Sequence, residues 1–476
     1  LNEEGKVILK NLRLNEMHEF MEMIGEGSGR SIQIWKWLYS KGRWIENLEQ
    51  ASGGVIFLYT INRMACQKDT CPLFVPYRRQ KLEEVATVDS GLKFDSVVQA
   101  GDGTRKMIFE VTAGNAKTKS VETVIIPMKG GKIKSDRYTI CVSSQVGCAM
   151  NCQFCYTGRL GLLGNLMTSQ IVEQVVQAKR YLKSINDETP VSHIVFMGMG
   201  EPFDNYRAVM GAVAILSEPS HGGLQFDARK ITVSTVGLVD RIRQFRQESK
   251  AQLAVSLHAP TDEAGPHPSP ALPCPIRDRI VPLNKRHDLK ELLGTLRELY
   301  PEVNNTYTYT CILAVEMERL KERALKKKSL ESWNSRERQC IALPWQRGRH
   351  SGRWSLLYCT ASTNRRREPS AHHQKQEEDT SRPDGRRARD FVVFEYTMLG
   401  GVNDREADAR RLLEVTRGIN CIFNLITFNT HQESVFQSTP REQTRRFRQI
   451  LLEGGRICTI RDSRGDDNMS ACGQLG

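Results

Sequence analysis

Residues 141–155 read CVSSQVGCAMNCQFC and contain four cysteines, Cys141, Cys148, Cys152 and Cys155. The last three follow the spacing C-x3-C-x2-C, which suggests a cluster with three protein ligands and leaves Cys141 over. Thiolates suit iron–sulfur clusters and zinc, but a structural zinc site wants four ligands, usually in two pairs. No matching pair lies nearby, so the motif predicts a 4Fe–4S cluster with one iron open to a substrate or cofactor. A zinc knuckle and a chance group of cysteines stay as alternatives.

Strands and helices alternate from residue 137 onward. Each of six strand-like runs is followed by a helical pattern, which argues for an α/β fold with a parallel sheet, open or closed into a partial barrel. In such folds the chemistry lies at the carboxyl ends of the strands, and the cysteine motif comes at the end of the first. The strand-like runs are RYTICVSS (137–144), SHIVFMGM (192–199), RKITVST (229–235), AQLAVSLH (251–258), FVVFEYTML (391–399) and CIFNLITFN (421–429).

The chain outside these runs has a different character. Residues 6–50 carry apolar residues at helical spacing and read as short helices, whereas residues 92–127 alternate β-type runs with turn signals, as in a small antiparallel unit. Residues 264–276 are rich in proline, and residues 311–390 are basic and low in aliphatic pattern. We interpret these last two stretches as insertions that are either disordered or artefactual, such as untranslated sequence read as protein.

The composition narrows the class of protein. Disulfide-dense domains are usually short, so 13 cysteines in 476 residues, with tight local spacing, fit a metal site in a reducing compartment better. The net charge is +13, but residues 317–390 hold 19 Lys and Arg against 10 Asp and Glu, which leaves +4 for the rest of the chain. That balance is compatible with an RNA partner without establishing one.

No run of about 18 apolar residues occurs, so we expect no membrane span. Because the chain begins at Leu1 rather than Met, a missing targeting peptide carries no weight.

Polar residues stand at the ends of the later strands. A glycine there lets the backbone approach a ligand closely, and a glutamate can accept hydrogen bonds from an ammonium group. Taken singly, each residue would be an ordinary strand cap, but together on one face they predict a ligand pocket. The residues are Gly200 and Glu201 in MGMGEP (197–202), Ser234 in VST (233–235), Ser256, Leu257 and His258 in SLHAP (256–260), and Asn429 in ITFNT (426–430).

A C-x3-C-x2-C motif after the first strand of a β-α series is typical of radical S-adenosylmethionine (SAM) enzymes, in which SAM chelates the open iron. The motifs together resemble those of the radical SAM rRNA adenine C2-methyltransferases of the RlmN/Cfr group. The resemblance implies a partial (β/α)6 TIM-like barrel over 136–476, a helical accessory domain over 1–85 and a small β linker over 86–135. It rests on CVSSQVGCAMNCQFC, MGMGEP, SLHAP, VNDREADA (402–409) and RGDDNMSACGQLG (464–476), and covers about residues 5–310 and 391–476.

The family's mechanism, carried over by position, implies a role for each of these cysteines. Cys472 would take a methyl group from a first SAM, and a second SAM, cleaved to a 5′-deoxyadenosyl radical, would activate that methyl group for addition to an adenine. Cys141 would release the resulting protein–RNA crosslink by forming a transient disulfide with Cys472, which requires Cα atoms within about 7 Å. Glu122 would be the proton acceptor. The cluster ligands would be Cys148, Cys152 and Cys155.

The chemistry of adenine agrees with this route. C2 is electrophilic and has no nucleophilic lone pair, so ordinary SN2 transfer from SAM fails there, whereas a carbon radical can add. The resemblance implies large-subunit rRNA as substrate, with the adenine beside the anticodon of some tRNAs as a second target. It also implies a flavodoxin- or ferredoxin-type electron donor. We expect a monomer in bacterial cytoplasm, plastid or mitochondrial matrix. A C8-specific enzyme of the same family and a non-methylating radical SAM enzyme are the alternatives.

Overall fold

The computed structural model describes residues 1–52, 82–111, 119–130, 135–261, 280, 288–302, 390–431, 434–461 and 463–476. The predicted insertions over 264–276 and 311–390 lie outside these ranges, apart from Asp390. Within the described ranges, no helix is both long and apolar enough to cross a membrane.

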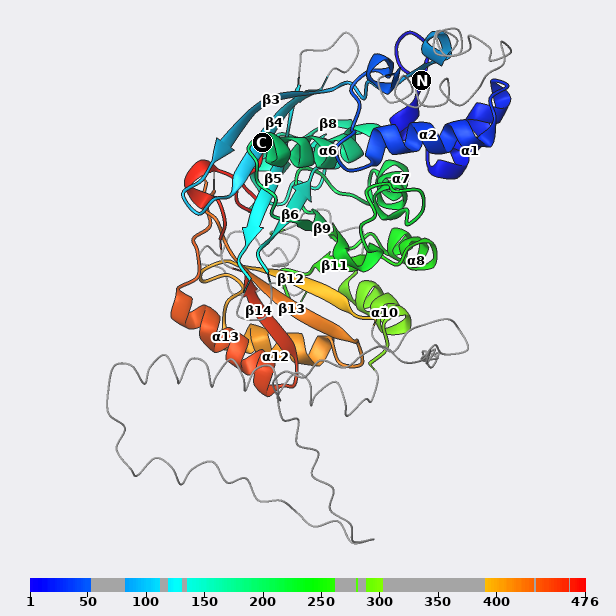
Figure 1. The fold of residues 1–476 in the computed structure, drawn as a ribbon. Helices are drawn as coiled ribbons and strands as arrows, with labels where there is room; N and C mark the ends of the chain where they lie inside the picture. The colour runs from blue at the N-terminus through cyan, green and yellow to red at the C-terminus, as the bar shows by residue number, and fades with distance from the viewer. Residues whose placement is uncertain are drawn as a thin grey trace, which may run out of the picture. The chain divides into compact units, whose positions relative to one another are not determined.

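A ten-stranded mixed sheet forms the core of the molecule (Figure 1). Its strands run in the order β14-β13-β12-β11-β10-β9-β6-β5-β4-β3, and every pair from β6 to β14 is parallel. The strands of this sheet are β3 (Leu92–Gln99), β4 (Arg105–Val111), β5 (Lys119–Met128), β6 (Arg137–Val142), β9 (Val191–Phe196), β10 (Ile231–Thr235), β11 (Gln252–Ser256), β12 (Val392–Met398), β13 (Cys421–Thr427) and β14 (Ile457–Arg461). The short strands outside it are β1 (Val7–Ile8), β2 (Ala86–Thr87), β7 (Gln145–Gly147) and β8 (Leu162–Asn165).

Helices follow the parallel strands along the chain and lie on the outer side of the curved sheet (Figure 1). The α-helices are α1 (Leu14–Met23), α2 (Ser28–Tyr39), α5 (Tyr156–Arg159), α6 (Thr168–Ser184), α7 (Tyr206–Ser217), α8 (Val239–Glu248), α10 (Leu289–Leu299), α12 (Glu406–Val415) and α13 (Arg441–Glu453). Short 3-10 helices are η1 (Leu9–Asn11), η2 (Leu48–Ser52), η3 (Ala228–Lys230) and η6 (Asp466–Asn468).

The α/β fold expected from the sequence is confirmed. Each of the six strand-like runs contains one strand of the parallel part, and a helix follows each of them. The structure adds one parallel strand that the sequence analysis missed, β14, which pairs with β13 at the edge of the sheet.

The parallel strands curl so that residues far apart in the strand order meet on the concave face. Arg461 ends β14, yet its Nη1 donates to Sδ of Met197 at 3.5 Å, just after β9, although four strands separate β14 from β9. Ser234 of β10 likewise donates to Oε2 of Glu395 on β12 at 2.7 Å, across β11. Such contacts require a strongly curved sheet, as in a partial barrel.

The antiparallel strands β3, β4 and β5 extend the same sheet beyond β6. Lys106 of β4 lies opposite Val124 of β5, and Val124 lies opposite Cys141 of β6. Residues directly opposite one another share a face, as do residues two apart on one strand. Lys106, Cys141 and Glu122 therefore all project from one face of the sheet.

Helix α6 shows how the sequence builds the outer layer. Its buried residues Ile171, Val175, Ala178 and Leu182 recur at intervals of three and four, which places them on one stripe facing the sheet. Glu173 is also buried, with 3% of its surface exposed, and a buried carboxylate is costly unless it is paired.

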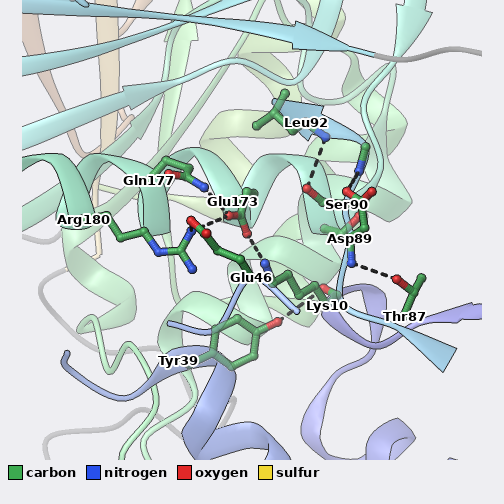
Figure 2. Close-up of polar contacts among 12 residues, drawn as sticks. Lys10, Tyr39, Glu46, Thr87, Asp89, Ser90, Leu92, Glu173, Gln177 and Arg180 are labelled. Atoms are coloured by element: carbon green, nitrogen blue, oxygen red, sulfur yellow. Dashed lines mark hydrogen bonds and ion pairs between the residues drawn. The ribbon is translucent and has the colours of Figure 1, made fainter. Parts of the chain in front are cut away.

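Lys10 in η1 provides the partner for Glu173 (Figure 2). Its Nζ lies 2.6 Å from Oε2 of Glu173, and both side chains are almost fully buried. The other carboxylate oxygen accepts from Gln177 at 2.8 Å and lies 3.6 Å from Arg180, which also pairs with Glu46 at 2.7 Å. This network joins the N-terminal helical region to α6.

We expect Lys10→Ala to lower the free energy of unfolding by about 3 to 5 kcal/mol, because it leaves Glu173 charged and buried. Lys6→Ala is the matched control. Lys6 is half-buried and pairs at 3.2 Å with the exposed Glu4, and such a solvent-accessible ion pair contributes at most about 1 kcal/mol. Urea unfolding followed by circular dichroism measures both. Equal midpoints for the two variants would contradict the prediction.

Candidate active site

The cysteine motif lies on a loop held by the hairpin of β7 and β8. Gly147 has φ +71°, and a Cβ there would lie 1.9 Å from the carbonyl oxygen of Gly161, so no larger residue fits. The backbone N–H of Cys148 donates to the same carbonyl at 2.9 Å. Two further backbone hydrogen bonds shape the loop. The N–H of Cys155 donates to the carbonyl of Cys152 at 3.0 Å, and the N–H of Tyr156 donates to the carbonyl of Gly473 at 2.8 Å.

The loop carries the three thiols of the motif. Cys148, Cys152 and Cys155 are free, and the charge of each of the other two would raise the pKa of Cys152. Burial raises the pKa of Cys148 to about 12, and it also raises the pKa values of Cys152 and Cys155. A bound metal deprotonates a coordinating thiol, so this environment favours thiolates only with a metal group present. Within the described ranges, no three His, Cys, Asp or Glu side chains form a site for a single metal ion.

Cys141 and Cys472 line one small cavity on the concave face of the sheet. Its volume is about 20 Å³, room for about one water molecule. Cys141 is buried on β6 and Cys472 is half-buried on the C-terminal segment, and both are free thiols. Burial raises the pKa of Cys141 to about 12 and the pKa of Cys472 to about 11.

Residues 463–476, which we call the Cys472 segment, are tied to separate parts of the chain. The turn between β3 and β4 holds the segment through the N–H of Gly101, which donates to Oδ2 of Asp467 at 2.8 Å. After β13, Asn429 donates its Nδ2 hydrogen to the carbonyl of Cys472 at 3.0 Å. The position of the Cys472 thiol therefore depends on strands from opposite ends of the sheet.

Glu122 lies beside the same segment. Its Oε1 is 3.0 Å from Nζ of Lys106, and Nζ also donates to the carbonyl of Met469 at 3.1 Å. Oε2 of Glu122 accepts from the N–H of Gly476 at 3.1 Å. Burial raises the pKa of Glu122, while Lys106 opposes the rise. Lys106 thus connects Glu122 to the segment that carries Cys472.

Gly200 and Glu201, which the sequence predicts after the second parallel strand, are held by contacts with neighbouring protein residues. Gly200 has φ +96°, and a Cβ there would lie 2.5 Å from Cβ of Gln145, so the close approach that requires glycine is to a protein side chain. Glu201 is buried and accepts from the N–H groups of Phe203 and Val236, each at 2.9 Å. Burial raises the pKa of Glu201 to about 7, and these donors oppose the rise.

The remaining predicted pocket residues lie at the ends of later strands. Ser234 and Ser256 are among the last residues of β10 and β11, Leu257 and His258 directly follow β11, and Asn429 follows β13. His258 has φ +48°, and its Nδ1 accepts from the N–H of Thr397 at 3.2 Å. Its ring packs edge-to-face on Phe154 of the cysteine loop, with 4.7 Å between centroids. Of the group, Asn429 lines the cavity of Cys141 and Cys472.

Three charged residues of this region were missed by the sequence analysis. Arg461 lines the cavity, and Glu395 is buried, with Oε1 unpartnered within the described ranges. Lys106 is the third. The sequence could have indicated Glu395, because it is a charged residue inside the apolar run FVVFEYTML. Burying an unpaired charge costs free energy, so such a residue suggests a functional role.

Comparisons with known proteins agree with this arrangement. The Radical SAM superfamily model matches residues 142–324. The chain is 33% identical over 471 residues to the dual-specificity RNA methyltransferase RlmN of Geotalea uraniireducens, covering 99% of this chain and 96% of that protein. The crystal structure of a radical SAM methyltransferase from Sphaerobacter thermophilus has a TM-score of 0.65 and 29% identity, with 98% of both chains covered. The chain therefore belongs to the RlmN family of radical SAM RNA methyltransferases.

Proposed function

We propose that this chain methylates C2 of an adenine in large-subunit rRNA, and the adenine beside the anticodon in some tRNAs, by way of a methyl group carried on Cys472. The observation that carries the proposal is the cavity shared by Cys141 and Cys472, which are more than three hundred residues apart in the sequence. A direct transfer from SAM to a base would need neither thiol. A route through the protein needs both.

The cysteine loop fits the 4Fe–4S cluster that the family implies. Its donors are three free thiols that lie close enough to influence one another's charge, and thiolates are the usual ligands of such clusters. When bound, the cluster supplies the electron that cleaves SAM to a 5′-deoxyadenosyl radical. Cys148, Cys152 and Cys155 would hold it.

We assign the SAM pocket to the strand ends on the same side of the sheet. Two SAM molecules are used per turnover, one as methyl donor and one as radical source. The pocket residues would be Gly200, Glu201, Ser234, Ser256, Leu257, His258 and Asn429. The contact of His258 with Phe154 supports this assignment, because it joins the pocket to the cysteine loop.

Cys472 and Cys141 act in sequence. The Cys472 thiolate accepts the methyl group, and a hydrogen atom then passes from that group to the 5′-deoxyadenosyl radical. The carbon radical adds to C2, and loss of the C2 proton and of one electron, which the cluster would take back, leaves the base joined to the Cys472 sulfur. The Cys141 thiolate then attacks this sulfur, so that a disulfide forms, the sulfur–carbon bond breaks, and the carbon leaves with the electron pair and takes a proton from solvent. A dithiol reductant returns both cysteines to thiols.

Glu122 would accept the proton that leaves C2. Its ion pair with Lys106 at 3.0 Å holds the carboxylate beside the Cys472 segment. Burial raises the pKa of Glu122, and a raised pKa brings a carboxylate closer to the strength that a base needs near neutral pH.

The RNA must present an unstacked adenine, because C2 is inaccessible within a stacked helix. The adenine would have to reach the Cys472 sulfur at the cavity that Cys141 and Cys472 line. We also propose that the enzyme is a monomer that receives electrons from a flavodoxin- or ferredoxin-type donor. It would work in a reducing compartment, either bacterial cytoplasm or an organelle matrix.

Anaerobic reconstitution of the cluster tests the function. With SAM, a reductant and an rRNA fragment or a tRNA, we expect 5′-deoxyadenosine and 2-methyladenosine, both measured by mass spectrometry of digested nucleosides. An intact cluster without SAM cleavage would contradict the radical mechanism. Formation of 8-methyladenosine instead would contradict C2 specificity, and methylation of one RNA alone would decide between rRNA and tRNA.

A further inference from the structure

Arg461 lies at the cavity of Cys141 and Cys472, and the proposed mechanism gives it no task. Its Nη1 donates to Sδ of Met197 at 3.5 Å. Met197 directly follows β9, and β9 is the parallel neighbour of β6, where Val195 lies opposite Cys141. The guanidinium therefore crosses the concave face and ends next to the strand pair that carries Cys141.

Within the described ranges, the hydrogen bond of Arg461 does not neutralise its charge. A guanidinium has five N–H donors, and within the described ranges its hydrogen-bond partner is a thioether sulfur, which is a weak acceptor. Its charge interacts with Cys472, Glu395 and Cys141. Among the described residues Arg461 makes no ion pair within 4.0 Å, and one oxygen of Glu395, Oε2, is bound by Ser234.

We propose that Arg461 is a positioning residue that stabilises the thiolate of Cys141, the nucleophile that releases the methylated base from Cys472. The inference rests on the proposed roles of Cys141 and Cys472, and it adds Arg461 as a third residue that acts in the release step. In the release step, the Cys141 thiolate gives its electron pair to the Cys472 sulfur, and the bond from that sulfur to the substrate carbon breaks. A positive charge beside the attacking sulfur favours the anion that the step requires.

The charges around Cys141 agree with this role. Burial is the largest influence and raises the pKa of Cys141 to about 12, while Arg461 is the strongest opposing influence. Cys472 and Glu395 raise the pKa of Cys141 further when they are charged, and the N–H of Met197 lowers it. The same guanidinium lowers the pKa of Cys472, against burial, Glu395 and Cys155. Arg461 is thus the cation that both thiols face.

Thiol oxidation tests the inference without SAM or RNA. The anaerobically purified full chain is treated with hydrogen peroxide, a reagent close to water in size that can enter the small cavity that Cys141 lines, at a series of pH values. Oxidation of each cysteine is followed by peptide mass spectrometry. Each unit rise in a thiol pKa lowers its thiolate fraction tenfold at pH values below the pKa. We expect Arg461→Met to slow oxidation of Cys141 by about tenfold or more at a fixed pH, and Arg461→Lys to restore most of the rate.

Arg464→Met is the matched control. Arg464 lines the same cavity, but it lies 3.8 Å from Asp102, and Arg461 is the cation that acts most strongly on Cys141. The buried Cys421 and Cys458 serve as internal standards for the folded state. If they become reactive in Arg461→Met, the Arg461→Gln variant is read in its place.

An unchanged oxidation profile in folded Arg461→Met or Arg461→Gln would overturn the inference, as would an equal slowing in Arg464→Met. Neither result would affect the proposed function, which depends on SAM cleavage and on formation of 2-methyladenosine. Conversely, a chain that cleaves no SAM would refute the proposed function and leave the oxidation result standing.

Discussion

We expect Cys141→Ala to accumulate a covalent protein–RNA adduct during turnover, and Cys472→Ala to form neither adduct nor methylated base. In the proposed mechanism the first variant can still carry the methyl group and join it to the adenine, but it lacks the thiol that breaks the sulfur–carbon bond. The second variant would have no sulfur to carry the methyl group. A denaturing gel with labelled RNA measures the adduct, and nucleoside mass spectrometry measures 2-methyladenosine, which should fall to background in both.

Cys421→Ala is the control for this pair. Cys421 is a buried, free cysteine at the start of β13, and it does not line the cavity of Cys141 and Cys472. We expect it to turn over without accumulating an adduct. Normal turnover of Cys141→Ala would show that another group releases the base, and an adduct in Cys472→Ala would show that another residue is the carrier.

Replacing any one cysteine of the cluster loop by serine should reduce SAM cleavage to background. Serine offers a hard oxygen where the cluster takes soft thiolates, and three protein ligands leave none to spare. The variants are Cys148→Ser, Cys152→Ser and Cys155→Ser. Iron and sulfide content, the visible absorbance of the cluster and release of 5′-deoxyadenosine measure the effect.

Cys458→Ala separates loss of the cluster from general damage. Cys458 is buried in β14 and free, and it has no place in the loop. It should retain iron and cleave SAM at the rate of the unchanged chain. A loop variant that kept a full cluster and normal cleavage would remove that cysteine from the ligand set.

The sequence predicts those parts of the site that are formed by residues close together in the chain. C-x3-C-x2-C constrains three thiols to one loop whatever the rest of the chain does, and the β-α rhythm places that loop at a strand end. Strand β14, Ile457–Arg461, was missed because it holds polar residues and lies at the edge of the sheet. Edge strands bury less apolar surface and so carry a weaker pattern.

The contacts of Lys106 and Arg461 could not be read from the sequence for a different reason. Lys106 meets Glu122 because of the register between β4 and β5, and Arg461 reaches Met197 because of the curl of the whole sheet. Both depend on long-range geometry, which residue types and spacing do not encode. The sequence predicted Gly200 as a site of close backbone approach, but the neighbour at that approach is Gln145.

The tethering of the Cys472 segment bears on the order of events during folding. Its bonds to the β3–β4 turn span 366 residues in the case of Gly101 and Asp467, and 369 in the case of Gln99 and Asn468. Contacts of such sequence separation form late, because the entropy of closing the loop must be met first. The strands that carry the cysteine loop can thus pair before the Cys472 segment has docked against the β3–β4 turn. Any reaction that needs Cys472 beside Cys141 would have to wait for that docking, whatever the state of the cysteine loop.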